Sequence, residues 1–253
     1  FDSGVGGLSI ASCIHQTLPN ENLIYVADTL HAPYGDMQPQ ALAKRVHAIA
    51  QYFLSKQVKA MVVACNTATV NVIGQLRQEI DVPIIGVEPA IKPAALESKN
   101  AKVGILVTQA MAKNEHFLQL VNRHKNGAQV HIQACPGLVD LIEQGKIDSI
   151  QCQQLLQEYL TPLLNKGIDS LVLGCTHYPF LIKQIENIAG KHLTIHQTAT
   201  PVTNQLKRRL TDSLLEAPTT QQGQCQFLSS KVSTQQQKLF SKLWQQTVNL
   251  QPL

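Results

Sequence analysis

The chain carries the stretch MVVACNTAT at residues 61–69 and the similar stretch LVLGCTHYP at residues 171–179. In each stretch a short apolar run leads to one cysteine, Cys65 or Cys175, and hydroxyl or amide side chains follow at once. Such a run predicts a buried strand, and the polar residues after it indicate that the strand ends at a polar opening. One such cysteine suggests a nucleophile, whereas two suggest a site with a thiol on each side of one small substrate.

Short apolar runs alternate with helical patterns along the rest of the chain. Strands are predicted at residues 23–27, 60–64, 83–87, 102–107, 129–134, 170–174 and 193–196. Between them, segments such as 40–54 and 150–164 place apolar residues at helical spacing. This alternation predicts an α/β fold with mainly parallel sheets that are covered by helices on both faces.

Two similar α/β domains are predicted, with the active site in the cleft between them. The first domain consists of residues 1–89 and 202–253, and the second of residues 90–201. The switch falls near residues 88–93, where two prolines mark a helix start. The tail predicts a helix, a short strand near residues 225–228 and a closing helix, which together return to the first domain.

The beginning of the sequence is interpreted as the end of a strand. Phe1 and Asp2 are expected to be its last residues, and a few residues are expected to precede them because the sequence does not start with methionine. The glycine-rich stretch 3–7 does not match the spacing of a nucleotide-binding loop. Its glycines are expected to let the backbone approach a small ligand closely.

Composition excludes several classes of protein. Of the 253 residues, 44% are hydrophobic and 15% are charged, and the net charge is +4. The basic residues are scattered and their densest group, 207–209, is interpreted as a solvated helix face, so no nucleic-acid partner is expected. No apolar run approaches the roughly 20 residues of a membrane span, so no membrane partner is expected. The six cysteines lack metal-site spacing, which favours reduced thiols in the cytoplasm and no metal.

Residues at the predicted strand ends carry the candidate chemistry, because open α/β sheets bind ligands outside the carboxyl ends of their strands. These residues are Asp2, Ser3, Cys65, Asn66, Thr67, Cys175, Thr176 and His177. Most are neutral donors, which together with helix N-termini suit a carboxylate or a zwitterion. A thiol at a helix N-terminus has a lowered pKa, so it can act as a base or a nucleophile.

Each candidate also has a purely structural interpretation. A cysteine at a strand end can be a small buried hydrophobic residue. Four cysteines are assigned to that role: Cys13, Cys135, Cys152 and Cys225. Asp2 can cap the following helix instead of adjusting a thiol. His177 can bond to the backbone instead of exchanging a proton with Cys175, and a lone glutamate such as Glu143 is usually solvated.

Five motifs in order resemble glutamate racemase. They are Asp2-Ser3-Gly4-Val5-Gly6-Gly7, Pro33-Tyr34-Gly35, Ala64-Cys65-Asn66-Thr67-Ala68, Gly86-Val87-Glu88-Pro89-Ala90 and Gly174-Cys175-Thr176-His177-Tyr178-Pro179. The likeness runs from Phe1 to about Pro179 and continues more loosely to the end. It implies a cofactor-independent enzyme that interconverts L- and D-glutamate and supplies D-glutamate for peptidoglycan in the bacterial cytoplasm. A homodimer is expected.

The resemblance implies that two cysteine thiols form a pair of bases. Cys65 and Cys175 remove and return the α-proton from opposite faces, with Cys65 acting on the D-isomer and Cys175 on the L-isomer. Asp2, Glu143 and His177 match positions that assist the thiols. The residues that match substrate contacts are Ser3, Pro33, Tyr34, Gly35, Asn66, Thr67, Thr108 and Thr176.

The chain departs from the family pattern after one predicted strand, and further functions stay open. Where the family usually has a glycine and a second threonine after Thr108, this chain has Ala110 and Met111, which puts one hydroxyl contact to substrate in question.

The chain could be an aspartate or other amino-acid racemase of the same superfamily. It could also be a cysteine hydrolase with Cys175 as nucleophile and His177 as base, or a two-lobed amino-acid-binding protein.

Overall fold

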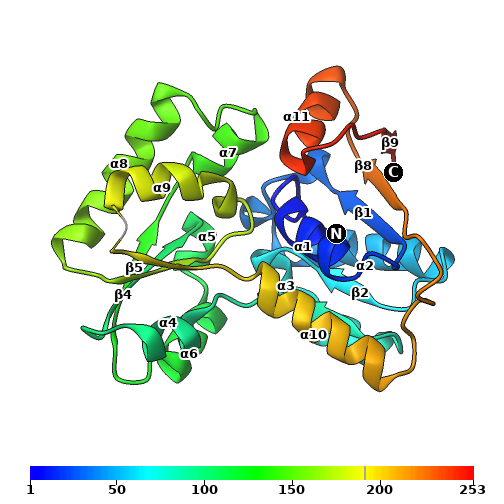
Figure 1. The fold of residues 1–253 in the computed structure, drawn as a ribbon, viewed down its shortest axis with the longest axis horizontal. Helices are drawn as coiled ribbons and strands as arrows, with labels where there is room; N and C mark the ends of the chain where they lie inside the picture. Colours follow the sequence, from blue (N-terminus) through cyan, green and yellow to red (C-terminus); the bar gives the residue numbers. More distant parts are fainter. Residues whose placement is uncertain (191) are drawn as a thin grey trace. The chain divides into compact units, whose positions relative to one another are not determined.

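The computed structural model describes residues 1–190 and 192–253, and the chain divides into two compact units. Unit 1 comprises Phe1–Val87 and Ala199–Leu253, and unit 2 comprises Glu88–Thr198. Both units alternate strands and helices (Figure 1). The predicted α/β class with mainly parallel sheets is confirmed, whereas the assignment of two similar domains stays a prediction.

Unit 1 contains two parallel sheets. In the first, β1 (Leu23–Ala27) pairs with β8 (Cys225–Ser229), which pairs with β9 (Leu250–Pro252). In the second, β2 (Met61–Val63) pairs with β3 (Ile84–Gly86). These apolar runs form strands because they bury their side chains between helix layers on both faces of the sheets.

A short backbone connection joins the two sheets at Phe1 and Asp2. Asp2 forms a parallel bridge with Ala27 in β1. On the other side, the N-terminal amino group of Phe1 donates to the Val62 carbonyl at 2.9 Å, and the Ala64 amide donates to the Phe1 carbonyl at 2.8 Å. The two residues therefore lie in an extended arrangement between β1 and β2, as expected for the end of a strand.

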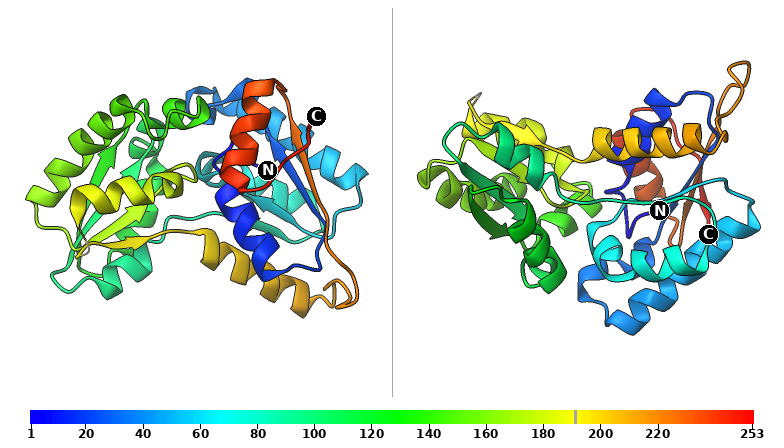
Figure 2. Two further views of the ribbon diagram at one scale, coloured as in Figure 1. Left: turned by 45° about the horizontal axis from the view of Figure 1, so that its top comes forward. Right: turned by 90° about the horizontal axis from the view of Figure 1, so that it is seen from below.

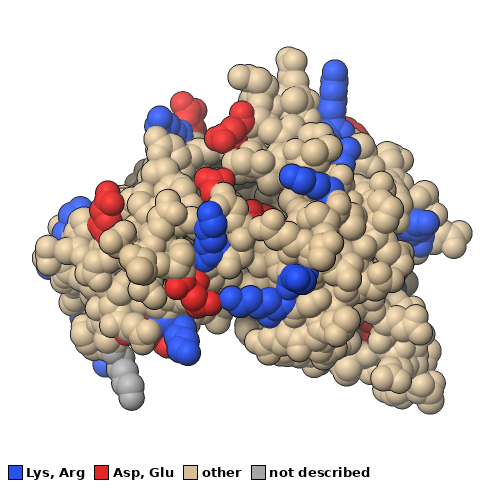
Figure 3. Space-filling model, turned by 90° about the horizontal axis from the view of Figure 1, so that it is seen from above, with Lys and Arg blue, Asp and Glu red and all other residues tan. Residues whose placement is uncertain are grey.

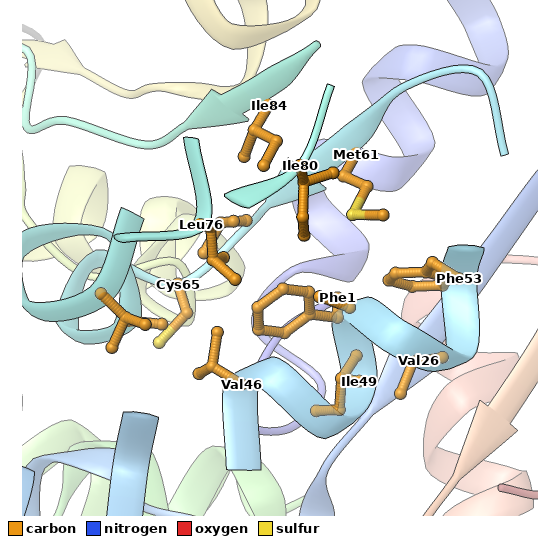
Figure 4. Close-up of a cluster of buried hydrophobic side chains, with 14 of the residues drawn as sticks. Phe1, Val26, Val46, Ile49, Phe53, Met61, Cys65, Leu76, Ile80 and Ile84 are labelled. Atoms are coloured by element: carbon orange, nitrogen blue, oxygen red, sulfur yellow. The ribbon is translucent and has the colours of Figure 1, made fainter. Parts of the chain in front are cut away.

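Helices cover both faces of these sheets. The helices of unit 1 are α1 (Leu8–Thr17), α2 (Pro39–Ser55), α3 (Asn66–Glu79), α10 (Ala199–Asp212) and α11 (Thr234–Trp244). One apolar cluster fills the space under α2 and α3, where the rings of Phe1 and Phe53 lie 6.3 Å apart among aliphatic side chains (Figure 4). A second cluster joins α1 to α10 through residues such as Ile14 and Leu206. α11 lies beside α1 in Figure 2, and the Trp244 ring contacts that of His15 at 5.6 Å.

Unit 2 has one parallel sheet with the strand order β5-β4-β6-β7. The strands are β5 (Gln129–Ala134), β4 (Lys102–Val107), β6 (Ser170–Leu173) and β7 (Thr194–His196). Its helices are α4 (Ile91–Glu97), α5 (Gln109–Ala112), α6 (Glu115–His124), α7 (Leu138–Glu143), α8 (Ile150–Asn165) and α9 (Ile182–Ala189). The central strands are buried almost throughout, which places their carboxyl ends against fixed surroundings.

Most charged residues lie at the surface, and buried exceptions include Asp2 and Asp28. On the face that Figure 3 draws, basic and acidic side chains are interspersed. Lys207, Arg208 and Arg209 are exposed on α10, in agreement with a solvated helix face. In the part of the chain that the structure describes, none of the helices combines the length and apolar character needed to cross a bilayer.

Candidate functional site

Cys65 lies where β2 ends and α3 begins. It occupies the N-cap position of α3, and only 6% of its surface is exposed. Its side chain belongs to the apolar cluster that contains Val46 and Leu76 (Figure 4). The aligned backbone dipoles of a helix favour negative charge at its N-terminus, so this position supports a thiolate.

Asn66 offers an unused donor next to this thiol. It is 5% exposed, and within the described residues its Nδ2 has no hydrogen-bond partner although it is buried. A buried donor without an acceptor is costly, so a ligand oxygen at this place would remove that cost. Thr67 follows in the first turn of α3 and is half-buried. The predicted neighbours of Cys65 are therefore assembled by the strand-to-helix junction itself.

Asp2 and Ser3 are buried at the beginning of unit 1. One carboxylate oxygen of Asp2 accepts the Gly7 amide at 2.7 Å, and the other lies 3.5 Å from the Ser3 hydroxyl. Asp2 is thus not the N-cap of α1, which is Gly7, but its carboxylate accepts the amide of that N-cap residue. At Gly7 an added Cβ would lie 2.8 Å from the Asp2 Cβ and 2.9 Å from the Tyr25 hydroxyl. This glycine is required by packing within the protein, whereas the sequence pattern had suggested that it makes room for a ligand.

The segment Pro33–Gly35 leads into the short 3₁₀ helix η2 (Tyr34–Asp36). The Tyr34 side chain is 2% exposed and its hydroxyl donates to Asp28 at 2.8 Å. Burial raises the pKa of Tyr34 and the negative charge of Asp28 raises it further, so the hydroxyl keeps its proton. Since this single hydroxyl proton is engaged by Asp28, the hydroxyl cannot also donate to a substrate carboxylate, whereas the backbone amides of this segment can.

Asp28 is a buried carboxylate at a strand end that sequence reasoning missed. It directly follows β1, is fully buried and forms an ion pair with Arg45 of α2. The available signal was its place immediately after a predicted strand, the same position that Cys65 and Cys175 occupy. Its partner Arg45 is half-buried and lies on a different predicted element, so no local sequence pattern links the two residues.

In unit 2, Cys175, His177 and Glu143 form a chain of contacts. The Cys175 sulfur lies 3.6 Å from His177 Nδ1, and His177 Nε2 lies 2.6 Å from Glu143 Oε1. Burial alone lowers the pKa of His177, but the hydrogen bonds and charges of Cys175 and Glu143 raise it well above its ordinary value. The protonated His177 can donate to the Cys175 sulfur on one side and to the Glu143 carboxylate on the other. Glu143, which position alone would assign to solvent, is therefore brought to the site by the end of α7.

The two similar stretches around Cys65 and Cys175 continue differently in the structure. At Cys65 the helix starts at the next residue, whereas Cys175 is followed by a turn and by the 3₁₀ helix η3 (Tyr178–Leu181) before α9 begins. Only Cys65 of the two therefore lies at an α-helix N-terminus. Gly174 precedes Cys175 because an added Cβ would lie 2.8 Å from the Leu106 carbonyl oxygen.

Three further residues of unit 2 lie near the same sheet edge. Thr176 is 3% exposed. Thr108 caps α5 by accepting the Met111 amide at 3.2 Å, which leaves its hydroxyl proton for a second interaction. Cys135 is 1% exposed, and its burial, together with the charge of Cys175, raises its pKa to about 12. Cys135 is therefore a neutral thiol, consistent with a structural residue.

The other cysteines and acidic residues that the structure describes do not form a metal site or a disulfide. All six cysteines are free thiols. Among the residues that the structure describes, no group of three or more His, Cys, Asp or Glu side chains could hold a metal ion. A cavity of about 540 Å³ in unit 1 is lined by both sheets and by apolar residues of α1 and α10. Asp2, Ser3, Cys65 and Asn66 are not among its lining residues, so the cavity is distinct from the candidate site.

The sequence and the structure of this chain are similar to those of known racemases. Residues 7–202 match the family model described as Asp/Glu/Hydantoin racemase. A glutamate racemase from Pseudomonas putida strain F1 is 42% identical over 254 residues, which cover 99% of this chain and 95% of that protein. The structure is similar to that of glutamate racemase isoform RacE1 from Bacillus anthracis, with a TM-score of 0.88, 28% identity and coverage of 100% and 95%. It is also similar to Escherichia coli glutamate racemase in complex with L-glutamate and an activator, with a TM-score of 0.87, 29% identity and coverage of 100% and 96%.

Proposed function

This chain belongs to the Asp/Glu/hydantoin racemase family and is an amino-acid isomerase, and we propose that it interconverts L- and D-glutamate by a two-cysteine, two-base mechanism. The observation that carries the proposal is the pair Cys65 and Cys175. Each lies at the carboxyl end of a strand in a parallel sheet, is buried, and has its own support for a thiolate. A hydrolase needs one such cysteine, whereas inversion at a carbon by proton exchange needs a base and an acid on opposite faces.

In the proposed reaction, one thiolate removes the α-proton and the other thiol returns a proton to the opposite face of the planar carbanion. Cys65 acts on the D-isomer and Cys175 on the L-isomer, and the roles exchange with the direction of reaction. Asp2 assists Cys65, and His177 with Glu143 assists Cys175. The contact chain of 3.6 and 2.6 Å supports this role for His177, because its cationic form stabilises the thiolate and can exchange a proton with it.

The chemistry requires more than a thiolate. A free thiol has a pKa near 8.5, so its thiolate is a weak base towards a carbon-bound α-proton. The site must therefore stabilise the carbanion by placing donors on the substrate carboxylate and by excluding water. The unpaired Nδ2 of Asn66 and the N-terminus of α3 support such a role for the Cys65 half.

The remaining substrate contacts follow the family pattern. We assign them to Ser3, Pro33, Tyr34, Gly35, Asn66, Thr67, Thr108 and Thr176. For Tyr34 the contact is assigned to the backbone, because its hydroxyl donates to Asp28. Thiols and neutral donors supply the acid, the base and the carboxylate site, so the proposed reaction proceeds without a cofactor. We further propose that the enzyme is a cytoplasmic homodimer that supplies D-glutamate for peptidoglycan synthesis.

Proton exchange with solvent tests the reaction. The protein is incubated with L-glutamate or D-glutamate in heavy water, and deuterium at the α-carbon is followed by NMR. Deuterium in the product enantiomer is expected, since the acid that returns the proton has exchanged with solvent. If no deuterium enters either enantiomer, the racemase proposal is wrong. Exchange into aspartate but not glutamate would instead support an aspartate racemase.

The same samples distinguish a racemase from a hydrolase and from a binding protein. A cysteine hydrolase that uses Cys175 and His177 would release a carboxylic acid from an ester or amide substrate and would leave the α-proton of glutamate in place. An amino-acid-binding protein would bind glutamate in calorimetry and also leave that proton in place. Either pattern contradicts the proposal.

A further inference from the structure

Asp28, at the carboxyl end of β1, is a fully buried carboxylate that the mechanism above does not use. We propose that Asp28, held by Arg45, is a positioning residue that fixes both Asp2 and the Pro33–Gly35 segment for substrate binding. This inference rests on the proposed function insofar as that segment contacts the substrate. Nothing in the comparisons assigns a role to Asp28 or Arg45.

The carboxylate of Asp28 is held on two sides by Arg45. Arg45 Nε donates to Oδ2 at 2.6 Å, and a terminal guanidinium nitrogen donates to Oδ1 at 2.8 Å. A bidentate pair of this kind fixes the orientation of the carboxylate plane as well as its charge. Burial alone would raise the pKa of Asp28, but the hydrogen bonds from Arg45, His31 and Tyr34 lower it below its ordinary value.

The same two oxygens hold the segment that precedes α2. The Tyr34 hydroxyl donates to Oδ2 at 2.8 Å, and His31 Nδ1 lies 2.9 Å from Oδ1. A carboxylate offers about four acceptor positions, and the side chains of Arg45, Tyr34, His31 and Ser230 all bond to this one. Asp28 is thus engaged by groups of the protein and acts through Tyr34.

The main chain of Asp28 completes the arrangement. Its amide donates to the Asp2 carbonyl at 2.9 Å, and its own carbonyl accepts the His31 amide at 2.9 Å at the start of the 3₁₀ helix η1 (Thr29–His31). One residue thus connects the strand end that carries Asp2 with the segment that carries Tyr34. Tyr34 is buried, whereas most of the segment around it is half-buried or exposed, and its bond to Asp28 fixes that segment together with the His31 contact to the same carboxylate.

A second carboxylate in unit 1 provides a matched control. Glu21 is 9% exposed, lies 2.6 Å from Lys59 Nζ and accepts the Ala217 amide at 2.8 Å. Like Asp28, it holds a backbone segment through an ion pair. It contacts none of the predicted site residues in the hydrogen bonds and ion pairs described. Neutralising Glu21 therefore measures how much stability is lost when a buried ion pair of this kind is removed. It does so without displacing any of the predicted site residues.

The test compares Asp28→Asn with Glu21→Gln. For Asp28→Asn we expect KM for glutamate to rise about 10-fold or more, with a smaller change in kcat, because a misplaced binding segment weakens substrate binding. For Glu21→Gln we expect a lower Tm and a KM within about twofold of the wild type. If the two variants change KM equally, or if Asp28→Asn lowers Tm without changing KM, the positioning role is wrong.

A double-mutant cycle keeps the test decisive. Tyr34→Phe removes the hydroxyl alone, and its effect on KM should not add to that of Asp28→Asn, because both remove the same fixation. The effects of Glu21→Gln and Tyr34→Phe should add. Additive effects of Asp28→Asn and Tyr34→Phe would overturn the inference. If Asp28→Asn does not fold, Arg45→Lys takes its place in the cycle, since lysine keeps the charge but loses the bidentate geometry.

Hydrogen exchange separates this inference from the proposed function. In Asp28→Asn, exchange of the Met37 amide, which donates to the Tyr34 carbonyl at 3.3 Å, should become at least several-fold faster. In Glu21→Gln it should be unchanged. This readout does not depend on racemisation. If the wild-type protein fails the deuterium test, the proposed function is wrong. Exchange at Met37 would still decide the role of Asp28. Equal exchange in both variants would overturn that role.

Discussion

The surroundings of Cys65 and Cys175 differ although both residues end a strand of a parallel sheet. Cys65 is supported by the fixed dipole at the start of α3 and by a cluster of apolar side chains. Cys175 is supported by His177, a titratable side chain that is itself held by Glu143. A helix dipole does not change with pH, whereas an imidazolium does. In the proposed mechanism, backbone geometry supports the thiol of unit 1 and side-chain charge supports the thiol of unit 2.

The largest effect is expected when either thiol is removed. Cys65→Ser and Cys175→Ser should each lower steady-state racemisation of glutamate by about 10³-fold or more, because a serine hydroxyl is a far weaker acid than a thiol. Racemisation is followed by circular dichroism from both enantiomers. Cys13→Ser, in the same unit as Cys65 and half-buried, is the control and should keep the wild-type rate. A single mutant at Cys65 or Cys175 that kept near wild-type activity would contradict the two-base mechanism.

A smaller effect is expected when the support of Cys175 is removed. His177→Asn should lower kcat/KM about 10²-fold. The loss must be equal in both directions because the two enantiomers have the same free energy. The asymmetry appears in isotope effects: with α-deuterated L-glutamate the primary effect should grow, since proton removal by Cys175 becomes slower relative to the other steps. With α-deuterated D-glutamate it should shrink. Equal isotope effects for both enantiomers would contradict the assignment of His177 to Cys175 alone.

The smallest effect concerns the pH dependence of stability. The pKa of His177 is raised in the folded state, so its contribution to folding is complete below the unfolded value of about 6.5 and is lost as pH rises through the raised folded pKa. The wild type should therefore lose more Tm than His177→Asn between pH 6 and pH 9, by about 2–4 °C for each kcal/mol lost. Parallel Tm curves for the two proteins would contradict the raised pKa.

The pH dependence of stability that Asp28 contributes in unit 1 has the opposite sign to that of His177. Its pKa is lowered on folding, so its contribution is present above the unfolded value of about 3.9 and is lost as pH falls through the lowered folded pKa. The free energy of unfolding of the wild type should thus fall as pH drops below about 3.9, whereas a carboxylate with an unperturbed pKa would contribute no such loss. Asp28→Asn should flatten this acid limb, and urea unfolding between pH 5 and pH 2 measures it. An unchanged acid limb in the variant would show that Asp28 carries no such linkage.

Most strands could be predicted from the sequence, because a buried parallel strand is a continuous apolar run. The seven predicted runs correspond to β1 to β7, with ends that shift by one residue where pairing stops before the apolar run does. β9 (Leu250–Pro252) was not predicted, because it is three residues long and contains a proline. An edge strand tolerates proline, since one side of it needs no ladder donor.

The candidate site could be predicted only where its residues are neighbours in the sequence. Cys65 with Asn66, and Cys175 with His177, are separated by one or two positions, so strand ends reveal them. Glu143 reaches His177 across 34 positions, through the end of α7. Arg45 reaches Asp28 across 17 positions, through the packing of α2. Such contacts depend on how helices cover a sheet, which local patterns do not specify.

The joint between the two sheets of unit 1 has a consequence for the response of the protein to hydrostatic pressure. The cavity of about 540 Å³ is lined by Leu23–Tyr25 from β1 and by Ala60–Val62 at β2, and Phe1 is also among its lining residues. Pressure favours states in which internal void volume is eliminated, but this cavity is partly open to solvent and is lined by charged side chains such as Lys59 and Glu21 as well as by apolar ones. Water can therefore fill it, and it offers little void volume for pressure to remove. Unit 1 should thus resist hydrostatic pressure about as well as a close-packed domain does.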